Sequence, residues 1–411
     1  MTSVPLFTAF RGEHFADAAS LARRLAPPYD VIGPAQRAAL AALDPANIVH
    51  VDLPLAPEAG GDPYPVAAEM LASWRTAGTI VREALPSAYV LRTTAALPDG
   101  SLRSRTGAFL ALSAEPFSLG RVLPHEKTHA GPKEDRRRLM HATGCNLSPV
   151  FVLAPDESGA LAALLAEVER TPPWATCEAI GATQEVWIVG DGVAERIAKA
   201  AGEAPVYIAD GHHRFETSVL FRDEAPPAWR QGAARTLAHV VSFQDHGLAI
   251  LPTHRIVQGA PLSREAFLAA AQPYFTLASE AGDATLTVLF ADCAEVHLRL
   301  RPGADLSGVR DLPAHPAVRD LAVTLADALV IRGIAAKLMR GAPALGYTAD
   351  AAEARAAACG AECAFAVLLP PTRLDEVRRV ADAGQVMPQK STFFAPKIPT
   401  GVVIRRFEGE A

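Results

Sequence analysis

The chain has 411 residues, a formal net charge of −6, and a composition that is 50% hydrophobic and 20% charged. Its length exceeds the roughly 250–300 residues at which single cores stop growing, so we expect two or three domains. This composition excludes a disordered or fibrous protein, and the acidic balance disfavours a nucleic-acid partner because no overall basic field is present. A small-molecule partner is therefore the expectation.

The sequence also bears on the cellular compartment. Apolar runs fall far short of the ~20 residues that a membrane helix needs, and residues 1–15 lack the pattern of a signal peptide. The five cysteines are odd in number and scattered, which favours a reducing compartment over a disulfide framework. We therefore expect a cytoplasmic protein without a membrane segment. The oligomeric state is left open.

The first half of the chain reads as strands and helices in alternation. Two prolines before Tyr29 and Asp30 forbid a helix there and predict a rigid segment with an extended or turning backbone. Apolar periodicity and turn residues predict, in chain order, a hairpin over 88–94 and 102–113, a polar helix over 133–141, a strand over 150–153, a helix over 161–168, a strand over 185–189, a helix over 193–201 and a strand over 205–209.

A second hairpin is predicted over 238–243 and 248–257, and the chain changes character near residue 260. We therefore predict a catalytic or nucleotide-binding region over 1–260 and a mixed α/β region over 261–411. The fold class is α+β, that is, mixed α/β. In the second region the pattern predicts a helix over 264–272, strands over 285–290 and 296–300, helical spacing over 316–338, a strand over 364–369, a helix from about 372 and a strand over 402–407.

The most informative segment is Asp210-Gly211-His212-His213-Arg214, between the strand over 205–209 and helical spacing over 215–221. The N-terminus of a helix carries unpaired N–H groups and partial positive charge, so an anion such as phosphate is the natural ligand. Glycine permits close approach, arginine donates to phosphate oxygens, and histidine moves protons near neutral pH. The carboxylate suits Mg²⁺ or a hydroxyl proton, as in phosphoryl transfer. A purely structural alternative is open, in which Asp210 caps the helix and both histidines make packing contacts.

This pentapeptide after a strand resembles the phosphate-binding box of the ParB and sulfiredoxin superfamily, which includes kinases that phosphorylate free serine. The resemblance implies a ParB/sulfiredoxin-like core, with ATP or ADP bound by Gly211, His213 and Arg214. It further implies Asp210 and His212 near the transferred phosphoryl group, with Mg²⁺ at Asp210. The whole chain resembles an uncharacterised bacterial and archaeal family, domain of unknown function 1015, in the segments 27–31, 125–128, 132–136, 146–149, 251–255 and 387–392.

Other segments offer candidate site residues. Glu126 is a candidate general base, because the resemblance implies a base from another segment. Lys390 and Ser391 lie on a proline-rich stretch that continues to Ala395-Pro396-Lys397 and suits an anion site. His254 and Arg255 are candidate supporting contacts. A solvated polar loop, or a structural crossover, is the alternative for these segments.

Together these patterns predict a nucleotide-dependent phosphotransferase that acts on a small hydroxylated metabolite, with serine as the leading substrate. Two alternatives stay open. One is a metal-dependent hydrolase or lyase that acts on a phosphorylated metabolite. The other is a non-catalytic nucleotide sensor of ParB-like ancestry.

Overall fold

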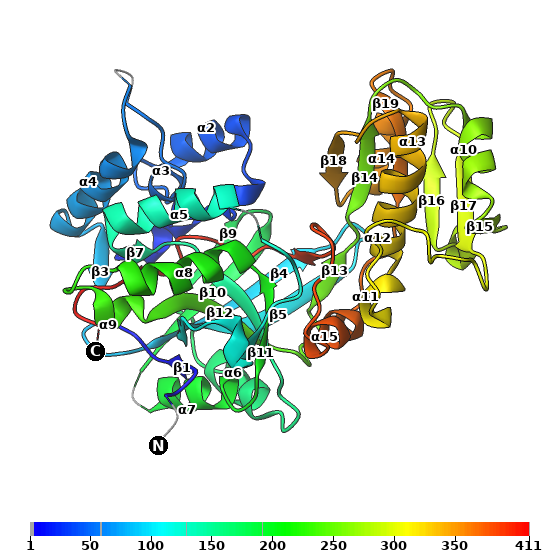
Figure 1. Ribbon diagram of the computed structural model, residues 1–411. Coiled ribbons are helices and arrows are strands. Elements are labelled where there is room, and N and C mark those ends of the chain that lie inside the picture. The colour runs from blue at the N-terminus through cyan, green and yellow to red at the C-terminus, as the bar shows by residue number, and fades with distance from the viewer. Residues whose placement is uncertain (1–3, 58–59, 129, 191, 411) are drawn as a thin grey trace. The chain divides into compact units, whose positions relative to one another are not determined.

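A computed structural model describes residues 4–57, 60–128, 130–190 and 192–410 (Figure 1). The chain divides into two compact units: unit 1 comprises residues 1–124, 128–248 and 396–411, and unit 2 comprises residues 125–127 and 249–395. These units differ from the predicted ranges 1–260 and 261–411, because residues 396–411 return to unit 1. Each unit has its own sheet and core.

The main sheet of unit 1 is mixed: β6 pairs in parallel with β11, and β12 with β8, whereas the other pairs are antiparallel. The expected hairpin over 88–94 and 102–113 is confirmed as β4 and β5. The strand order is β6 (Val122–Leu123), β11 (Val206–Asp210), β8 (Val150–Ala154), β12 (Arg235–Ser242), β5 (Leu102–Ser113), β4 (Ala88–Ala96), β10 (Ala182–Val189) and β9 (Ala175–Ala179), and β1 (Phe7–Thr8) also pairs with β5.

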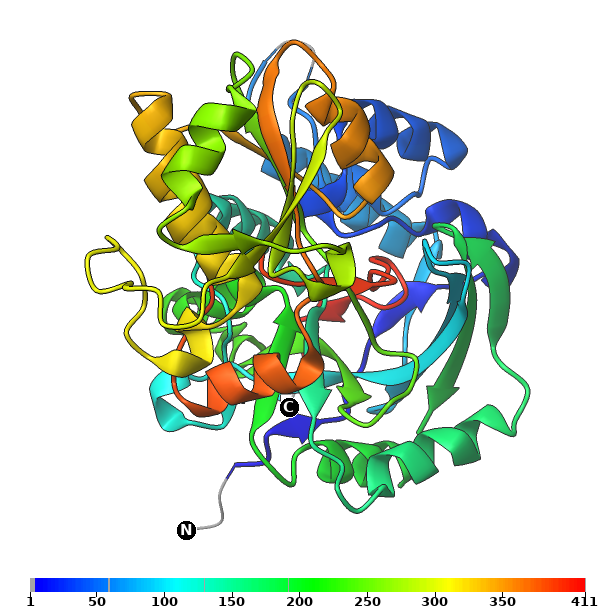
Figure 2. The same ribbon diagram turned by 90° about the vertical axis from the view of Figure 1, so that its right-hand side faces the viewer.

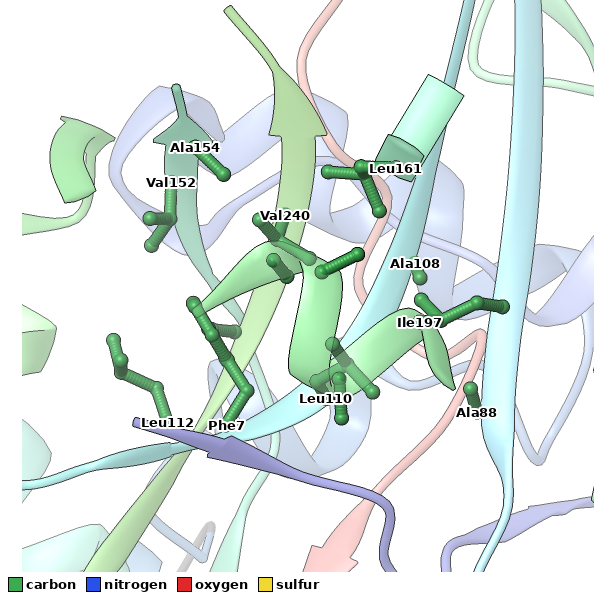
Figure 3. Close-up of a cluster of buried hydrophobic side chains, with 14 of the residues drawn as sticks. Phe7, Ala88, Ala108, Leu110, Leu112, Val152, Ala154, Leu161, Ile197 and Val240 are labelled. Atoms are coloured by element: carbon green, nitrogen blue, oxygen red, sulfur yellow. The ribbon is translucent and has the colours of Figure 1, made fainter. Parts of the chain in front are cut away.

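One face of this sheet forms the core of unit 1 with α6 (Ala160–Glu169) and α7 (Val193–Ala201). Because alternate residues of a strand face the same side, Val152 and Ala154 of β8 and Leu110 and Leu112 of β5 enter this core together. Figure 3 shows these side chains in one cluster with Leu161 of α6 and Ile197 of α7. The predicted helices over 161–168 and 193–201 are thus confirmed.

Further helices of unit 1 include α8 (His212–Glu224), which contacts β8 and β12, and α5 (Ala130–Thr143), which packs against α8. Gly144 follows the end of α5 at a positive φ of 64°. The strand predicted over 402–407 is confined to β21 (Arg405–Arg406). The smaller elements are β2 (Glu13–Phe15), α1 (Leu21–Arg24), α2 (Pro34–Leu43), α3 (Val49–Asp52), α4 (Pro63–Thr76), β3 (Ile80–Arg82), β7 (Cys145–Asn146), α9 (Arg230–Ala233) and β21 (Arg405–Arg406).

The prediction of a second hairpin over 238–243 and 248–257 is wrong. β12 is a central strand that already pairs with β5 on one side and β8 on the other, so it has no edge left for a hairpin partner. The following segment divides at Pro252, which lies between β13 (Ala249–Leu251) and β14 (His254–Gln258). β13 pairs with β20 (Phe393–Ala395), and β14 enters the sheet of unit 2.

The sheet of unit 2 is antiparallel throughout, in the order β15 (Phe275–Leu277), β17 (Glu295–Leu300), β16 (Leu286–Leu289), β19 (Cys363–Leu368), β14 and β18 (Leu345–Thr348). Alternation places Phe365 and Val367 on one face and Ala366 and Leu368 on the other. The first face packs against α10 (Arg264–Ala271) and the π-helical segment Ala326–Ala335, and the second against α14 (Ala351–Ala358), as Figure 2 shows.

The predicted helical spacing over 316–338 is divided among α11 (Pro316–Arg319), α12 (Ala322–Leu325), the π-helical segment and α13 (Ala336–Leu338). The helix expected from about 372 is α15 (Leu374–Asp382). Among the described residues, no helix is long and apolar enough to cross a membrane.

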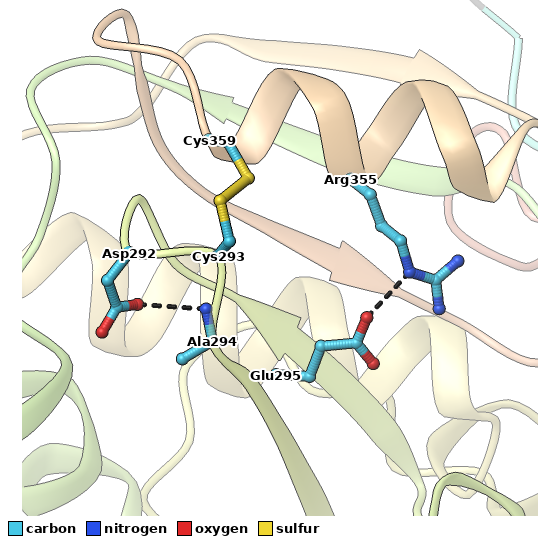
Figure 4. The surroundings of a disulfide bond; sticks show 6 residues. All are labelled: Asp292, Cys293, Ala294, Glu295, Arg355 and Cys359. Atoms are coloured by element: carbon cyan, nitrogen blue, oxygen red, sulfur yellow. Dashed lines mark hydrogen bonds and ion pairs between the residues drawn. A yellow bond between two sulfur atoms is a disulfide. The ribbon is translucent and has the colours of Figure 1, made fainter.

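A disulfide in unit 2 joins Cys293, in the turn between β16 and β17, to Cys359 at the end of α14 (Figure 4). An ion pair between Arg355 and Glu295, 2.7 Å long, links the same two elements. The scattered cysteines favoured free thiols, and this bond differs from that expectation. The difference arises because the fold brings the two Cα atoms, 66 residues apart in sequence, to 5.3 Å.

Candidate functional site at the start of helix α8

The strand that leads to the site contains a β-bulge directly before Asp210. In the pairing of β11 with β8, Ile208 faces Val152, but Asp210 faces Phe151, so Ala209 is an extra residue. A bulge of this kind redirects the side chain that follows it. Because of the bulge, Asp210 shares a face with Phe151 and does not follow Ile208 onto the α6 and α7 side.

Asp210 therefore lies at the end of a row of buried side chains that crosses the sheet. Phe151 lies opposite His239 of β12, which lies opposite Phe109 of β5. Burial, and secondarily the charge of Arg105, holds the pKa of His239 well below its usual range. The row places aromatic side chains beside Asp210, and the guanidinium of Arg105 lies 4.8 Å from the ring centre of Phe151.

Gly211 makes the sharp turn from strand to helix. It is the N-cap of α8 at φ 90°, a left-handed conformation that favours glycine, and no side chain caps the helix there. A Cβ at this position would lie 2.9 Å from the guanidinium carbon of Arg214. The lack of a side chain thus allows Arg214 to fold back over the turn.

Arg214 faces inward. Its side chain is only 9% exposed, one guanidinium nitrogen donates to the carbonyl of Pro149, and another lies 3.7 Å from Asp210 Oδ1. This geometry gives Arg214 a role in holding the turn and in supplying positive charge. The prediction that it contacts a nucleotide directly stays a prediction.

The carboxylate of Asp210 is ionised. Its Oδ1 accepts a hydrogen bond from the N–H of Gly211 at 2.8 Å, and its Oδ2 accepts one from Lys397 Nζ at 3.0 Å. Burial by itself raises the pKa of Asp210, but the charges of Lys397 and Arg214 outweigh it, so the pKa lies well below its usual range. A carboxylate with so low a pKa is a weak general base and a good partner for cations.

Lys397 contacts Asp210, although the sequence pattern favours Lys390 and not Lys397 as a site residue. Residue types mark the loop 387–397 as a candidate and favour Lys390 within it, but Lys390 is an exposed residue of unit 2. Lys397 is 16% exposed and belongs to the segment that returns to unit 1. Its pairing with Asp210 spans 187 positions and leaves no trace in local sequence.

The two histidines occupy the first turn of α8, between Gly211 and Arg214. His212 is buried, with 6% of its surface exposed, and His213 is half-buried. The positive charge that His212 can carry lowers the pKa of Asp210, which places the imidazole close to the carboxylate. Unit 1 therefore brings together five predicted site residues and Lys397.

The other predicted site residues, which are Glu126, His254, Arg255, Lys390 and Ser391, belong to unit 2. Arg255 has no exposed surface and donates to the backbone carbonyls of Thr253 and Lys390 at 2.7 and 3.0 Å. Ser391 donates to Pro388 at 2.6 Å. The guanidinium of Arg255 lies 5.1 Å from the ring centre of Tyr347, and Glu126 forms a parallel β-bridge with Met387. Their contacts show how the loop 387–391 is held, and their roles in a site stay predictions.

Two observations limit what the site can hold by itself. Within the described ranges, no group of three or more His, Cys, Asp or Glu side chains is placed to hold a metal ion. A cavity beside Arg214 in unit 1 has a volume of about 30 Å³. That space is far below the roughly 300 Å³ of small ligand pockets and suits a water molecule.

Residues 7–324 match the family described as "Protein of unknown function (DUF1015)". The chain belongs to this family. The match covers most of unit 1 of this DUF1015 protein, including the whole turn 210–214. No curated protein matches the sequence.

Several solved structures resemble this DUF1015 protein distantly. A conserved hypothetical protein from Pyrococcus furiosus is 13% identical, with 73% of this chain and 95% of that chain covered and a TM-score of 0.38. A free serine kinase in complex with AMP is 14% identical, with 72% and 92% covered and a TM-score of 0.37. C-terminally truncated SbnI from Staphylococcus aureus is 10% identical, with 71% and 85% covered and a TM-score of 0.37. Likenesses at this level do not identify the activity of the chain.

Proposed function

We propose that the chain is a nucleotide-dependent phosphotransferase that acts on a small hydroxylated metabolite, with serine as the leading substrate. The observation that carries the proposal is the ionised carboxylate of Asp210, held by Lys397 at 3.0 Å directly before the N-terminus of α8. Phosphoryl transfer relies on carboxylates and cations around the phosphates, and a helix N-terminus is a further site for phosphate. The resemblance of the pentapeptide to the box of free-serine kinases supports the same activity and a ParB/sulfiredoxin-like ancestry for unit 1.

In this proposal each residue has a separate task. The N-terminus of α8, with His213 and Lys397, binds the phosphates of ATP or ADP, while Arg214 holds the turn and adds positive charge. His212 accepts the proton of the attacking hydroxyl, because histidine is the most common general base in enzymes and Asp210, with its pKa well below the usual range, is too weak a base. Glu126 remains the alternative base.

A Mg²⁺ ion that arrives with the nucleotide needs only one or two carboxylates from the protein. Asp210 fits this requirement because it is ionised and 22% exposed, although Lys397 shares its Oδ2. The ion would neutralise phosphate charge. The residues of the turn would hold its nucleotide and exclude water.

The test is titration calorimetry with Mg·ATP and with Mg·ADP, followed by a turnover screen with serine and other hydroxylated metabolites. We expect Asp210→Asn to lower kcat/KM roughly 100-fold or more. The matched control is Asp223→Asn on the same helix, because the Asp223 side chain is 69% exposed and lies away from the turn. Absence of binding at millimolar nucleotide would reject the proposal. Turnover of phosphorylated metabolites without nucleotide would favour a hydrolase or lyase, and nucleotide binding without any turnover a sensor.

A further inference from the structure

A buried polar cluster in unit 1 joins helix α3 to two of the segments that carry the family resemblance, 132–136 and 146–149. It contains Asp52 at the end of α3, Arg136 of α5 and Ser148 after β7. Asp52 is 2% exposed and Arg136 is 5% exposed. Both line the cavity of about 30 Å³ together with Ser148 and Arg214. Charged side chains this deeply buried need a specific reason, since burial without partners is costly.

Two hydrogen bonds join the cluster, and the backbone from Ser148 to Pro149 connects it to the candidate site. Arg136 donates to Asp52 Oδ1 at 3.1 Å, and the hydroxyl of Ser148 donates to Asp52 Oδ2 at 2.7 Å. The next residue, Pro149, accepts the hydrogen bond from Arg214 through its carbonyl. Arg214 in turn lies against Gly211 and 3.7 Å from Asp210.

Both ends of this connection are fixed by further contacts. The guanidinium of Arg136 lies 3.9 Å from the ring centre of Tyr29 and is paired with Asp135 at 2.6 Å. Thr400 donates to the Ser148 hydroxyl at 3.2 Å, so the segment that carries Lys397 to Asp210 also contacts Ser148. Arg136 therefore cannot shift without disturbing the backbone on which Arg214 rests.

We propose that Asp52 and Arg136 are positioning residues of the candidate site, which act through Ser148 and the Pro149 carbonyl to hold Arg214 over the turn. The inference rests on the proposed function for the reaction that the site performs. Neither residue touches the ligand. Their contribution is the fixed geometry of the turn, and a displacement of about 1 Å can cost up to about 100-fold in rate.

The test compares Arg136→Lys with Arg137→Lys, the next residue of α5. Lysine keeps the charge at position 136 but cannot make both contacts of the guanidinium, whereas Arg137 is paired with Glu134 and Glu224 at 2.8 and 2.9 Å on the outer side. Ser148→Ala removes the hydrogen bond to Asp52 and the one from Thr400 without a change of charge. It serves as the second variant in case Arg136→Lys does not fold.

Two measurements are made on each variant: hydrogen–deuterium exchange of the peptide 206–215, and KM and kcat with Mg·nucleotide. We expect Arg136→Lys and Ser148→Ala to speed exchange in this peptide and to raise KM and lower kcat by roughly 10- to 100-fold, while Arg137→Lys behaves as wild type. A role in stability alone would lower Tm and leave KM unchanged. That result, with unchanged exchange, overturns the inference.

The exchange measurement separates this inference from the proposed function. If wild type does not bind nucleotide but both variants loosen the peptide 206–215, the proposed function fails and the positioning role stands. If wild type binds and turns over nucleotide but neither variant changes exchange or KM, the positioning role fails by itself.

Discussion

The carboxylate of Asp210 is approached by cations from two directions, Lys397 at 3.0 Å and Arg214 at 3.7 Å. Because its folded-state pKa is depressed, its pairing stabilises the protein above the unfolded pKa, near 4, and is lost as the pH falls further. At neutral pH the group is fully charged. Such a carboxylate is a good partner for cations and a weak acceptor of protons.

At Gly211 we predict that Gly211→Ala harms ligand binding as well as stability. Alanine at φ 90° costs about 1–2 kcal/mol in free energy of unfolding, and its Cβ would displace the Arg214 guanidinium. The control is Gly159→Ala, because Gly159 is the N-cap of α6 at φ 70° and a Cβ added there would meet nothing within 4 Å. Urea unfolding should show a loss for Gly211→Ala at least as large as that for Gly159→Ala, and calorimetry should show weaker nucleotide binding for Gly211→Ala alone. Equal affinities in the two variants would contradict this account.

His254 should make unit 2 sensitive to acid. It is 3% exposed, its Nδ1 accepts from the N–H of Leu369, and its Nε2 has no hydrogen-bond partner among the described residues. Burial, and then the charges of Arg355 and Arg255, lowers the pKa of His254 from 6.5 to about 4. The unfolded chain therefore binds the proton first, so stability is complete above pH 6.5 and falls between pH 6.5 and 4, by on the order of 2–3 kcal/mol.

The measurement is urea unfolding of unit 2 by a local probe at pH 7.5, 5.5 and 4.5. His254→Asn retains an acceptor for Leu369 but does not titrate, so its loss of stability over this window should be smaller than that of wild type. His246→Asn, at an exposed position of unit 1, should follow wild type. Parallel curves for wild type and His254→Asn would rule out the assignment.

Among the elements, α14 and the turn between β16 and β17 are joined by the Cys293–Cys359 bond. A cross-link over 66 residues restricts the unfolded chain and is worth about 4 kcal/mol in the chain-entropy account. We predict that reductant lowers the urea midpoint of unit 2 in wild type and in Cys177→Ser, whose thiol is free. The urea midpoint of unit 2 in Cys359→Ser should already be lower than in wild type, and reductant should not change it. Alkylation of five thiols in the unfolded, unreduced protein would show that the bond does not form.

Strands β11 and β12 show where local patterns succeed and fail. The strand, glycine turn and helix around residues 206–224 follow from residue types, because β-formers, Asp-Gly and helical spacing act locally. The bulge at Ala209, by contrast, depends on which strand pairs with β11. The predicted hairpin of β12 is wrong for the same reason: its partners β5 and β8 are distant in sequence.

At the scale of the whole molecule, the chain divides into two units, and residues 396–411 return to unit 1. This division decides which candidate site residues belong to the same unit. Asp210, Gly211, His212, His213 and Arg214 are joined in unit 1 by Lys397, while the remaining candidates belong to unit 2. Composition and periodicity do not indicate that residues 396–411 belong to unit 1. The net charge of −6 also says little about the local cations around Asp210.

The amino-acid sequence by itself determined the mixed class of the fold, the hairpin of β4 and β5, and a strand-turn-helix with two histidines and an arginine at its corner. These features depend on interactions between residues close in the chain. Only the tertiary structure decided the inward direction of Arg214, the pairing of Lys397 with Asp210, and the link from Arg136 through Asp52 and Ser148 to Pro149. Those contacts join residues from 65 to 187 positions apart, and their partners become neighbours only when the chain packs.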